Sequence, residues 1–269
     1  MREVLIVIAS FADGYLADLL DSIKENTTDV NYAIQVVDNH KNTELLDTLV
    51  KPYCEKWGIP LHLDTEITGY GDALNTGVGV SEEDSKYVLY MDSDTLVEKG
   101  WLREMIDCYE RHYDEGCRMV GPLVQDFNNK YLPGVPELYG NPNDIVGKDL
   151  KLPQTSYLIG VCILRRRDDI EEFTWDKNYF RAYWEDNDIS AQCRFWGYDI
   201  WVAGKSLMHH KVNSSHETIL KETGKTASHI GQSNKNYFHK KWFYIENKQM
   251  SEEEQRGFTL GTSIKRKSE

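Results

Sequence analysis

The chain has 269 residues, of which 40% are hydrophobic and 28% charged, values typical of a globular protein rather than a disordered one. Lysine and arginine number 31 against 44 aspartate and glutamate, so the formal net charge is −13, which argues against a protein that mainly binds the phosphate backbone of nucleic acid. No run approaches the roughly 20 apolar residues that span a bilayer, and the first residues are too weakly basic for a secretory signal, so we expect a cytoplasmic protein with at most peripheral membrane contact.

The first part of the chain alternates strand-like and helix-like segments. Short apolar runs rich in β-branched residues predict buried strands, which lie at 4–9, 33–37, 61–63 and 87–91. Apolar residues at three- and four-residue spacing predict helices that include Leu16, Leu45 and Trp101, and Gly69 and Gly71 predict a turn. This repeated order predicts an α/β fold with a parallel, doubly wound sheet, whose ligands bind at the carboxyl ends of the strands.

The second part of the chain is less regular. Residues 122–153 contain five of the seven prolines, so we expect a long loop region that shapes a site. The elements predicted after it are a strand at 157–164, a helix that ends at Gly197, and short strands at 200–203 and 207–210. The segment 234–245 is aromatic and basic, and we expect the last twenty or so residues to fray.

Cysteine usage gives little indication of function. The five cysteines are odd in number, widely spaced and without a CxxC pair, so the sequence indicates neither a disulfide framework nor a zinc site. We expect most of them to be small buried apolar side chains or unreactive thiols.

Two aspartates, Asp92 and Asp94, follow the predicted strand 87–91 directly. In an extended segment, residues two apart point the same way, so both carboxylates can address one point at the carboxyl end of the strand. Carboxylate oxygens suit Mg²⁺ or Mn²⁺, which complete their coordination with phosphate oxygens and water. An aspartate-rich turn is the alternative explanation for this segment taken alone.

Six short motifs occur in the order expected of one family. They are VVDN at 36–39, GYGDALNTGV at 69–78, MDSD at 91–94, GPL at 121–123, WEDNDI at 184–189 and HKVNSS at 210–215. Over roughly residues 2–245, the sequence resembles the inverting family 2 glycosyltransferases of GT-A fold. The resemblance implies a mostly parallel, Rossmann-like sheet with helices on both faces in one domain, 1–245. Within it, residues 1–122 would form the nucleotide-sugar-binding half and 123–245 a loop-rich acceptor and catalytic half, followed by a partly disordered tail at 246–269.

The resemblance also implies a nucleotide-sugar donor, with a UDP-sugar favoured. The residues that it assigns to this donor are Ser10, Asp38, Gly71, Asn75, Asp92 and Ser93. Asp38 would bind the uracil or ribose, and the glycine would allow close backbone approach. By resemblance, Asp94 would bind the metal. His209 and His210 point to opposite faces of a strand, so only one can reach the metal, and the HKVNSS match favours His210. Imidazole suits Mn²⁺ better than Mg²⁺, so Mn²⁺ is the favoured cofactor.

The WEDNDI segment would supply the catalytic carboxylates. By resemblance, Asp186 takes the proton of the acceptor hydroxyl as it attacks the anomeric carbon, and Glu185 is an acidic neighbour that can bind the acceptor. Asp188 remains a second candidate for the base. Acidic residues that favour a helix dipole are the alternative explanation for this segment taken alone.

Three functions stay open on the sequence. The first is transfer of a sugar to a hydroxyl acceptor, which can be a glycan, a lipid-linked compound or another molecule. The second is nucleotidyl transfer on a similar sheet, although residues 9–15 contain one glycine and no basic residue where a phosphate-binding loop would be needed. The third is an inactive sugar-binding or scaffold module, which would have little use for Asp94, Asp186 and His210 together. Weak peripheral membrane contact could come from the basic residues at 240–242 or 265–267.

Overall fold

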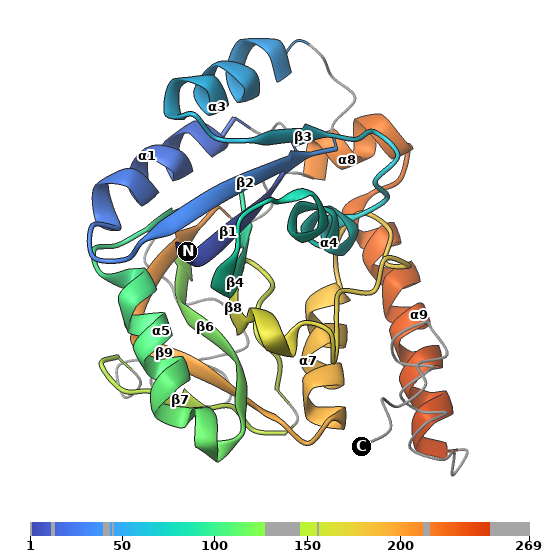
Figure 1. The fold of residues 1–269 in the computed structure, drawn as a ribbon. Coiled ribbons are helices and arrows are strands. Elements are labelled where there is room, and N and C mark those ends of the chain that lie inside the picture. The colour runs from blue at the N-terminus through green and yellow to red at the C-terminus, as the bar shows by residue number, and fades with distance from the viewer. Residues whose placement is uncertain are drawn as a thin grey trace.

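The computed structural model describes residues 2–11, 14–39, 44, 46–126, 146–154, 156–211 and 216–247, the side chains of residues 216–217 and 243–247 excepted. Nine strands in this part of the chain form one sheet in the spatial order β3-β2-β1-β4-β8-β6-β9-β5, with β7 on β9 (Figure 1). Their bounds are β1 Arg2–Ser10, β2 Tyr32–Asp38, β3 Leu61–Leu63, β4 Ser85–Asp92, β5 Thr95–Val97, β6 Cys117–Asp126, β7 Leu150–Lys151, β8 Cys162–Arg166 and β9 Asp199–His210.

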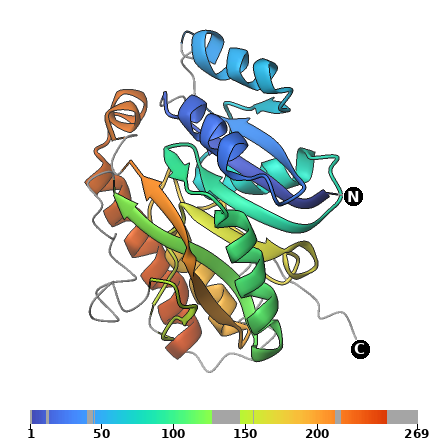
Figure 2. The ribbon, with the colours of Figure 1, turned by 90° about the vertical axis from the view of Figure 1, so that its left-hand side faces the viewer.

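Helices cover both faces of this sheet. Their bounds are α1 Leu16–Asn26, α3 Lys51–Trp57, α4 Tyr70–Val80, α5 Trp101–His112, α7 Glu185–Phe195, α8 His216–Thr223 and α9 Ala227–Asn247, with short turns η1 Leu46–Val50, η2 Tyr113–Glu115 and η4 Arg167–Asp169. One apolar core lies under α1, α3 and α5, and a second lies under α4 and α7. Figure 2 shows α5 crossing β6 and β9, and Figure 1 shows α9 alongside α7.

Strand β1 explains why two cores are needed. Val4, Ile6 and Ile8 belong to the core under α1 and α5, whereas Leu5 and Val7 belong to the core under α4. Successive side chains of a strand point to opposite faces, so a continuous apolar run requires a cover on each side. Six strands, β1 to β4, β6 and β9, run in one direction, and β5, β7 and β8 run against them. The predicted α/β fold class with a mostly parallel sheet is confirmed.

Several elements of the second half differ from the predictions. The strand predicted at 157–164 is β8, which begins at Cys162, and the two strands predicted at 200–203 and 207–210 are the single strand β9. The loop predicted from residue 122 begins later, because β6 continues to Asp126. Where β6 contains Pro122, the pairing with β9 skips three residues, from Ala203 to Leu207. Proline lacks an N–H donor, which explains the irregular register. Pro122 also explains why the sequence indicated a loop where the strand continues.

Helix α4 replaces the turn predicted around Gly69 and Gly71. Gly69 precedes the helix and Gly71 lies in its first turn. Helices α8 and α9 were not predicted either. The segment 127–145, residues 212–215 of the HKVNSS motif and the tail from residue 248 lie outside the described residues. Among the helices that the structure does describe, none has the length and apolar character needed to cross a bilayer.

The close packing of α4 against the sheet generates a testable prediction. A Cβ atom at Gly77 would lie 2.3 Å from Val7 Cγ1, whereas one at Gly79 would meet nothing within 4 Å. We expect Gly77→Ala to lower the free energy of unfolding by about 1–3 kcal/mol because of overpacking. Gly79→Ala, on the exposed side of the same helix, should raise it by about 0.5–1 kcal/mol through helix propensity. Urea denaturation of both variants measures the difference, and equal effects would contradict the packing explanation.

Candidate active site

A cleft of about 270 Å³ opens at the carboxyl ends of β1 and β4. Seven of the ten predicted site residues line it, and they are Ser10, Asp92, Ser93, Asp94, Glu185, Asp186 and His210. They come from the ends of β1, β4 and β9, the turn after β4, and the start of α7. This is the edge at which an α/β sheet is expected to bind its ligands.

Three of these residues form a group that can hold a metal ion. Asp92, Asp94 and His210 each offer a ligand atom, and these atoms lie within 4.8 Å of one another. The Nε2 atom of His210 is 3.2 Å from Asp94 Oδ1. Two carboxylates and one imidazole form a donor set that fits Mn²⁺. The neighbouring His209 points away, with its Nε2 atom 3.0 Å from Glu98 Oε1, as strand alternation predicts.

The two aspartates approach each other in a way that the sequence did not indicate. Asp92 ends β4, whereas Asp94 lies in the tight turn between β4 and β5 rather than in an extended segment. The hydroxyl of Thr95 closes this turn by donating to the Asp92 carbonyl at 3.0 Å. Antiparallel pairing of β5 with β9 then sets Thr95 opposite His210. Backbone pairing therefore brings the imidazole to the aspartates.

Glu185 and Asp186 are the first two residues of α7. Glu185 is buried, and Asp186 accepts hydrogen bonds from the backbone N–H groups of Asn187 at 2.8 Å and Gly160 at 3.3 Å. Burial raises the pKa of both carboxyls, and the charge of Asp186 raises that of Glu185 further. A Cβ atom at Gly160 would lie 3.1 Å from Asp186 Cβ, so the glycine leaves room for this carboxylate. Each of these two carboxyls therefore keeps its proton up to a higher pH than an ordinary carboxyl does.

The segment before α7 has an unusual backbone. Arg181, Tyr183 and Trp184 have φ angles of 63°, 79° and 74°, in the left-handed region that side chains other than glycine rarely adopt. Such residues cost about 1–3 kcal/mol each and persist only where surrounding contacts hold them. The Nδ2 group of Asn234, in α9, donates to the carbonyls of Phe180, Ala182 and Tyr183 at 3.0, 2.8 and 3.1 Å.

The other side of this segment is held by the start of α4. The N–H of Arg181 donates to Thr68 O at 2.9 Å, and the N–H of Tyr70 donates to Arg181 O at 2.7 Å. A Cβ atom at Gly69 would lie 2.3 Å from Tyr179 O, so only glycine allows this approach. The segment is thus fixed between α4 and α9, and it directs Arg181 and Tyr183 to the cleft.

Arg181 is a lining residue that the sequence reasoning missed. Its Nη2 atom pairs with Glu222 Oε2 at 2.9 Å, while Nε and Nη1 are buried and have no hydrogen-bond partner among the described residues. Asn39 and Tyr70 also line the cleft without having been predicted there. Tyr70 was inside a recognised motif, whereas no pattern in the sequence marks Arg181.

Three predicted donor residues do not line the cleft. Asp38 is buried behind it and accepts a hydrogen bond from Ser10 Oγ at 2.8 Å. Asn75 donates from Nδ2 to Trp175 O at 2.8 Å, and a Cβ atom at Gly71 would lie 2.9 Å from Trp175 Cβ. The contacts of Gly71 and Asn75 hold α4 against the chain around Trp175, and their proposed donor contacts stay predictions.

Asp188, the second candidate for the base, is fully buried away from the cleft. It accepts hydrogen bonds from Lys241 Nζ at 2.8 Å, Gln192 Nε2 at 2.7 Å and Trp242 Nε1 at 2.9 Å. The ammonium of Lys241 also lies 2.8 Å from Asp176 Oδ2. Asp188 thus joins α7 to α9, and Asp186 is the one of the two aspartates that faces the cleft.

Comparison with known proteins gives one family match. The model for Glycosyl transferase family 2 matches residues 5–174. No curated protein sequence matches the chain.

Solved structures share the fold at low sequence identity. GalNAc-T7, crystallised with UDP, GalNAc and Mn²⁺, has a TM-score of 0.68 and 15% identity, over 96% of this chain and 54% of that one. S. aureus TarS 1–349 has a TM-score of 0.58 and 15% identity, over 94% and 77% of the two chains. Its complex with UDP-GlcNAc has a TM-score of 0.61 and 14% identity, over 96% and 73%. The chain therefore spans about half the length of GalNAc-T7.

The buried charges between α7 and α9 lead to a second prediction. Lys241→Met would leave Asp176 and Asp188 buried without their cation, so we expect the free energy of unfolding to fall by about 3–5 kcal/mol. Lys240→Met is the matched control, because Lys240 is exposed on the same helix and its replacement should change stability by less than about 0.5 kcal/mol. Urea denaturation measures both, and a Lys241→Met variant as stable as the control would rule out this role for the ion pairs.

Proposed function

The chain belongs to Glycosyl transferase family 2, and we propose that this glycosyltransferase moves a sugar from a UDP-sugar to a hydroxyl acceptor, with a divalent metal and with inversion at the anomeric carbon. The observation that carries the proposal is that one cleft is lined both by Asp92, Asp94 and His210 and by the carboxylate of Asp186. An inverting transfer needs charge stabilisation for the leaving diphosphate and a base for the incoming hydroxyl on the opposite side of the sugar. In this proposal, residues 1–122 bind the donor and residues 123–245 provide the acceptor and catalytic half.

Asp94 and His210 are the proposed metal ligands, with Asp92 beside them. The donor set favours Mn²⁺ over Mg²⁺, and the presence of Mn²⁺ in the GalNAc-T7 structure supports the choice. When bound, the cation supplies positive charge to the departing diphosphate. Arg181 adds a second positive charge, because its Nε and Nη1 groups can donate to phosphate oxygens.

Asp186 is the proposed general base. Its carboxylate accepts the acceptor's hydroxyl proton as the hydroxyl oxygen attacks the anomeric carbon. The raised pKa brings this group closer to the working pH, where a general base is most effective. Glu185, whose pKa is also raised, would hold the acceptor by a hydrogen bond. The acceptor, which could be a glycan, a lipid-linked compound or another hydroxyl compound, and the cytoplasmic location both stay predictions from the sequence.

The uridine nucleotide would lie toward the ends of β1 and β2. Ser10 lines this part of the cleft, and Asp38 fixes the Ser10 hydroxyl from behind, while Ser93 lines the cleft from the turn after β4. The carboxylate of Asp38 could accept a hydrogen bond from the N3–H group of uracil. Alternatively, it could orient the Ser10 hydroxyl, whose oxygen then accepts that hydrogen bond. The structures of GalNAc-T7 with UDP and of TarS with UDP-GlcNAc support a uridine donor.

The role of Asp186 can be tested by Asp186→Asn, which keeps the volume and removes the base. We expect turnover to fall by roughly two to four orders of magnitude with little change in UDP affinity. The assay measures the rate at which UDP is released by donor hydrolysis or by transfer. Asp188→Asn is the comparison, since its main effect should be on stability, measured by urea denaturation. A near wild-type rate for Asp186→Asn would assign the base to another group.

The metal and the nucleotide can be tested by titration calorimetry. We expect UDP to bind more tightly than GDP, ADP or CDP with Mn²⁺ present, and to bind much more weakly after EDTA treatment. Asp94→Asn should lose the metal dependence because it removes a charged ligand next to His210. If GDP binds more tightly than UDP, the donor assignment is wrong, and if full activity persists in EDTA, the metal role is wrong.

A further inference from the structure

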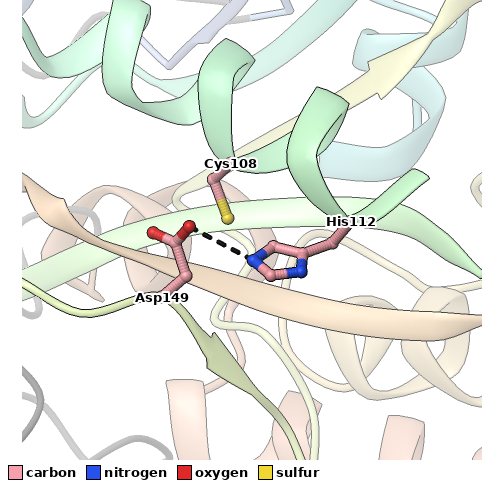
Figure 3. A group of neighbouring side chains, drawn as sticks. All are labelled: Cys108, His112 and Asp149. Carbon is pink, nitrogen blue, oxygen red and sulfur yellow. Dashed lines mark hydrogen bonds and ion pairs between the residues drawn. The ribbon is translucent and has the colours of Figure 1, made fainter. Parts of the chain in front are cut away.

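A second group of metal-ligating side chains lies outside the cleft, at the end of α5. Cys108 and His112 are four residues apart, so they lie on one face of the helix, and Asp149 directly precedes β7. Their ligand atoms lie within 4.8 Å of one another. Figure 3 shows the Cys108 sulfur pointing to the space between the carboxylate of Asp149 and the imidazole of His112.

This cluster is far from the candidate active site. The ring of His112 stacks on Trp201, with 3.6 Å between centroids and an interplanar angle of 8°. Trp201 and His210 both lie in β9, nine residues apart. Their partners in β6, Val120 and Asp126, are six residues apart, so at about 3.3 Å per residue of strand the two clusters are separated by roughly 20 Å. The second cluster therefore does not belong to the cleft in which the sugar transfer is proposed.

Neighbouring charges orient two of the three side chains. His112 Nδ1 is 3.0 Å from Glu115 Oε1, and His112 Nε2 is 3.3 Å from Asp149 Oδ2. The guanidinium of Arg111 donates to Asp149 Oδ2 from Nε at 2.9 Å and from Nη2 at 2.7 Å. A carboxylate on the far nitrogen of a histidine and a hydrogen-bonded carboxylate ligand are the contacts that orient ligands in zinc sites.

We propose that Cys108, His112 and Asp149 bind a Zn²⁺ ion, with water as the fourth ligand. A tetrahedral ion with bonds of about 2.0–2.1 Å to nitrogen and oxygen sets these atoms about 3.3–3.4 Å apart. The separation of His112 Nε2 and Asp149 Oδ2, 3.3 Å, agrees with this geometry. A thiolate ligand favours Zn²⁺ over the Mn²⁺ or Mg²⁺ suited to the cleft.

The charges of the surrounding side chains and the solvent exposure of the ligands are compatible with a bound Zn²⁺ ion. The thiolate, Asp149 and Glu115 carry three negative charges, which Zn²⁺ and Arg111 balance. Burial raises the pKa of the Cys108 thiol, so the metal displaces the thiol proton to solvent on binding. The side chains of His112 and Asp149 are 18% and 12% exposed, so solvent reaches both of them. The bound ion would fasten the end of α5 to the chain that enters β7.

Cobalt substitution tests the site in the full chain. After removal of metal with a chelator, we expect Co²⁺ to give a sulfur-to-cobalt charge-transfer band that saturates at one equivalent and is removed by Zn²⁺. Binding at Asp92, Asp94 and His210 gives no such band, because that cluster has no thiolate. Cys108→Ser should abolish the band, whereas Cys54→Ser, which removes a buried thiol of α3, should keep it.

A second variant keeps the test decisive if Cys108→Ser does not fold. Glu115→Gln leaves all three ligands in place and weakens only the contact that orients His112, so we expect about 10–100-fold weaker Co²⁺ binding. Absence of the band in the wild-type protein would overturn the proposal, and so would a band that survives in Cys108→Ser. A His112 side chain that is held by Glu115 and Asp149 alone, without a metal, predicts the first of these results.

Discussion

The pairing of β5 with the end of β9 is the interaction on which the candidate site depends. β9 runs for twelve residues across the sheet, and its last three residues pair with Thr95, Leu96 and Val97. The N–H of Lys211 extends this contact by donating to Asp94 O at 2.9 Å. These bonds join backbone groups, and they bring His210 from late in the chain to the turn after β4. The meeting of Asp92, Asp94 and His210 is therefore a consequence of strand register rather than of attraction between these side chains.

Helix α7, which begins with Glu185 and Asp186, depends on a different type of contact, between buried polar groups. Its first turn follows three residues with left-handed backbone, and these are held by Asn234, while its inner face is joined to α9 through Asp188 and Lys241. Breaking such contacts is costly because each leaves a desolvated polar group without a partner. Two elements, α4 and α9, thus hold the segment that leads to Asp186.

The sequence predicted those elements whose local hydrophobic pattern matches their burial in the fold. The strands β1, β2 and β4 are continuous apolar runs, and the motif residues Asp92, Asp94, Asp186 and His210 meet in one cleft as expected. It failed where packing overrides propensity: Gly77 in α4 and Pro122 in β6 are unfavourable in isolation but fit their neighbours. Arg181 and Asn234 were not predictable from the sequence. Asn234 contacts Phe180, 54 positions away, and Lys241 contacts Asp188, 53 positions away. Contacts at such separations leave no periodic signal in the sequence.

The position of α9 in the chain has a consequence for biosynthesis. The family match ends at residue 174, yet Asp186 is oriented by side chains at 234 and 241, close to the last residues that the structure describes. A ribosome releases β1 to β4 long before α9, so these strands can assemble while α7 still lacks its support. The support of α7 is then completed only when α9 docks. A protein shortened before α9 would retain every motif of the family and lack the helix that makes them work together.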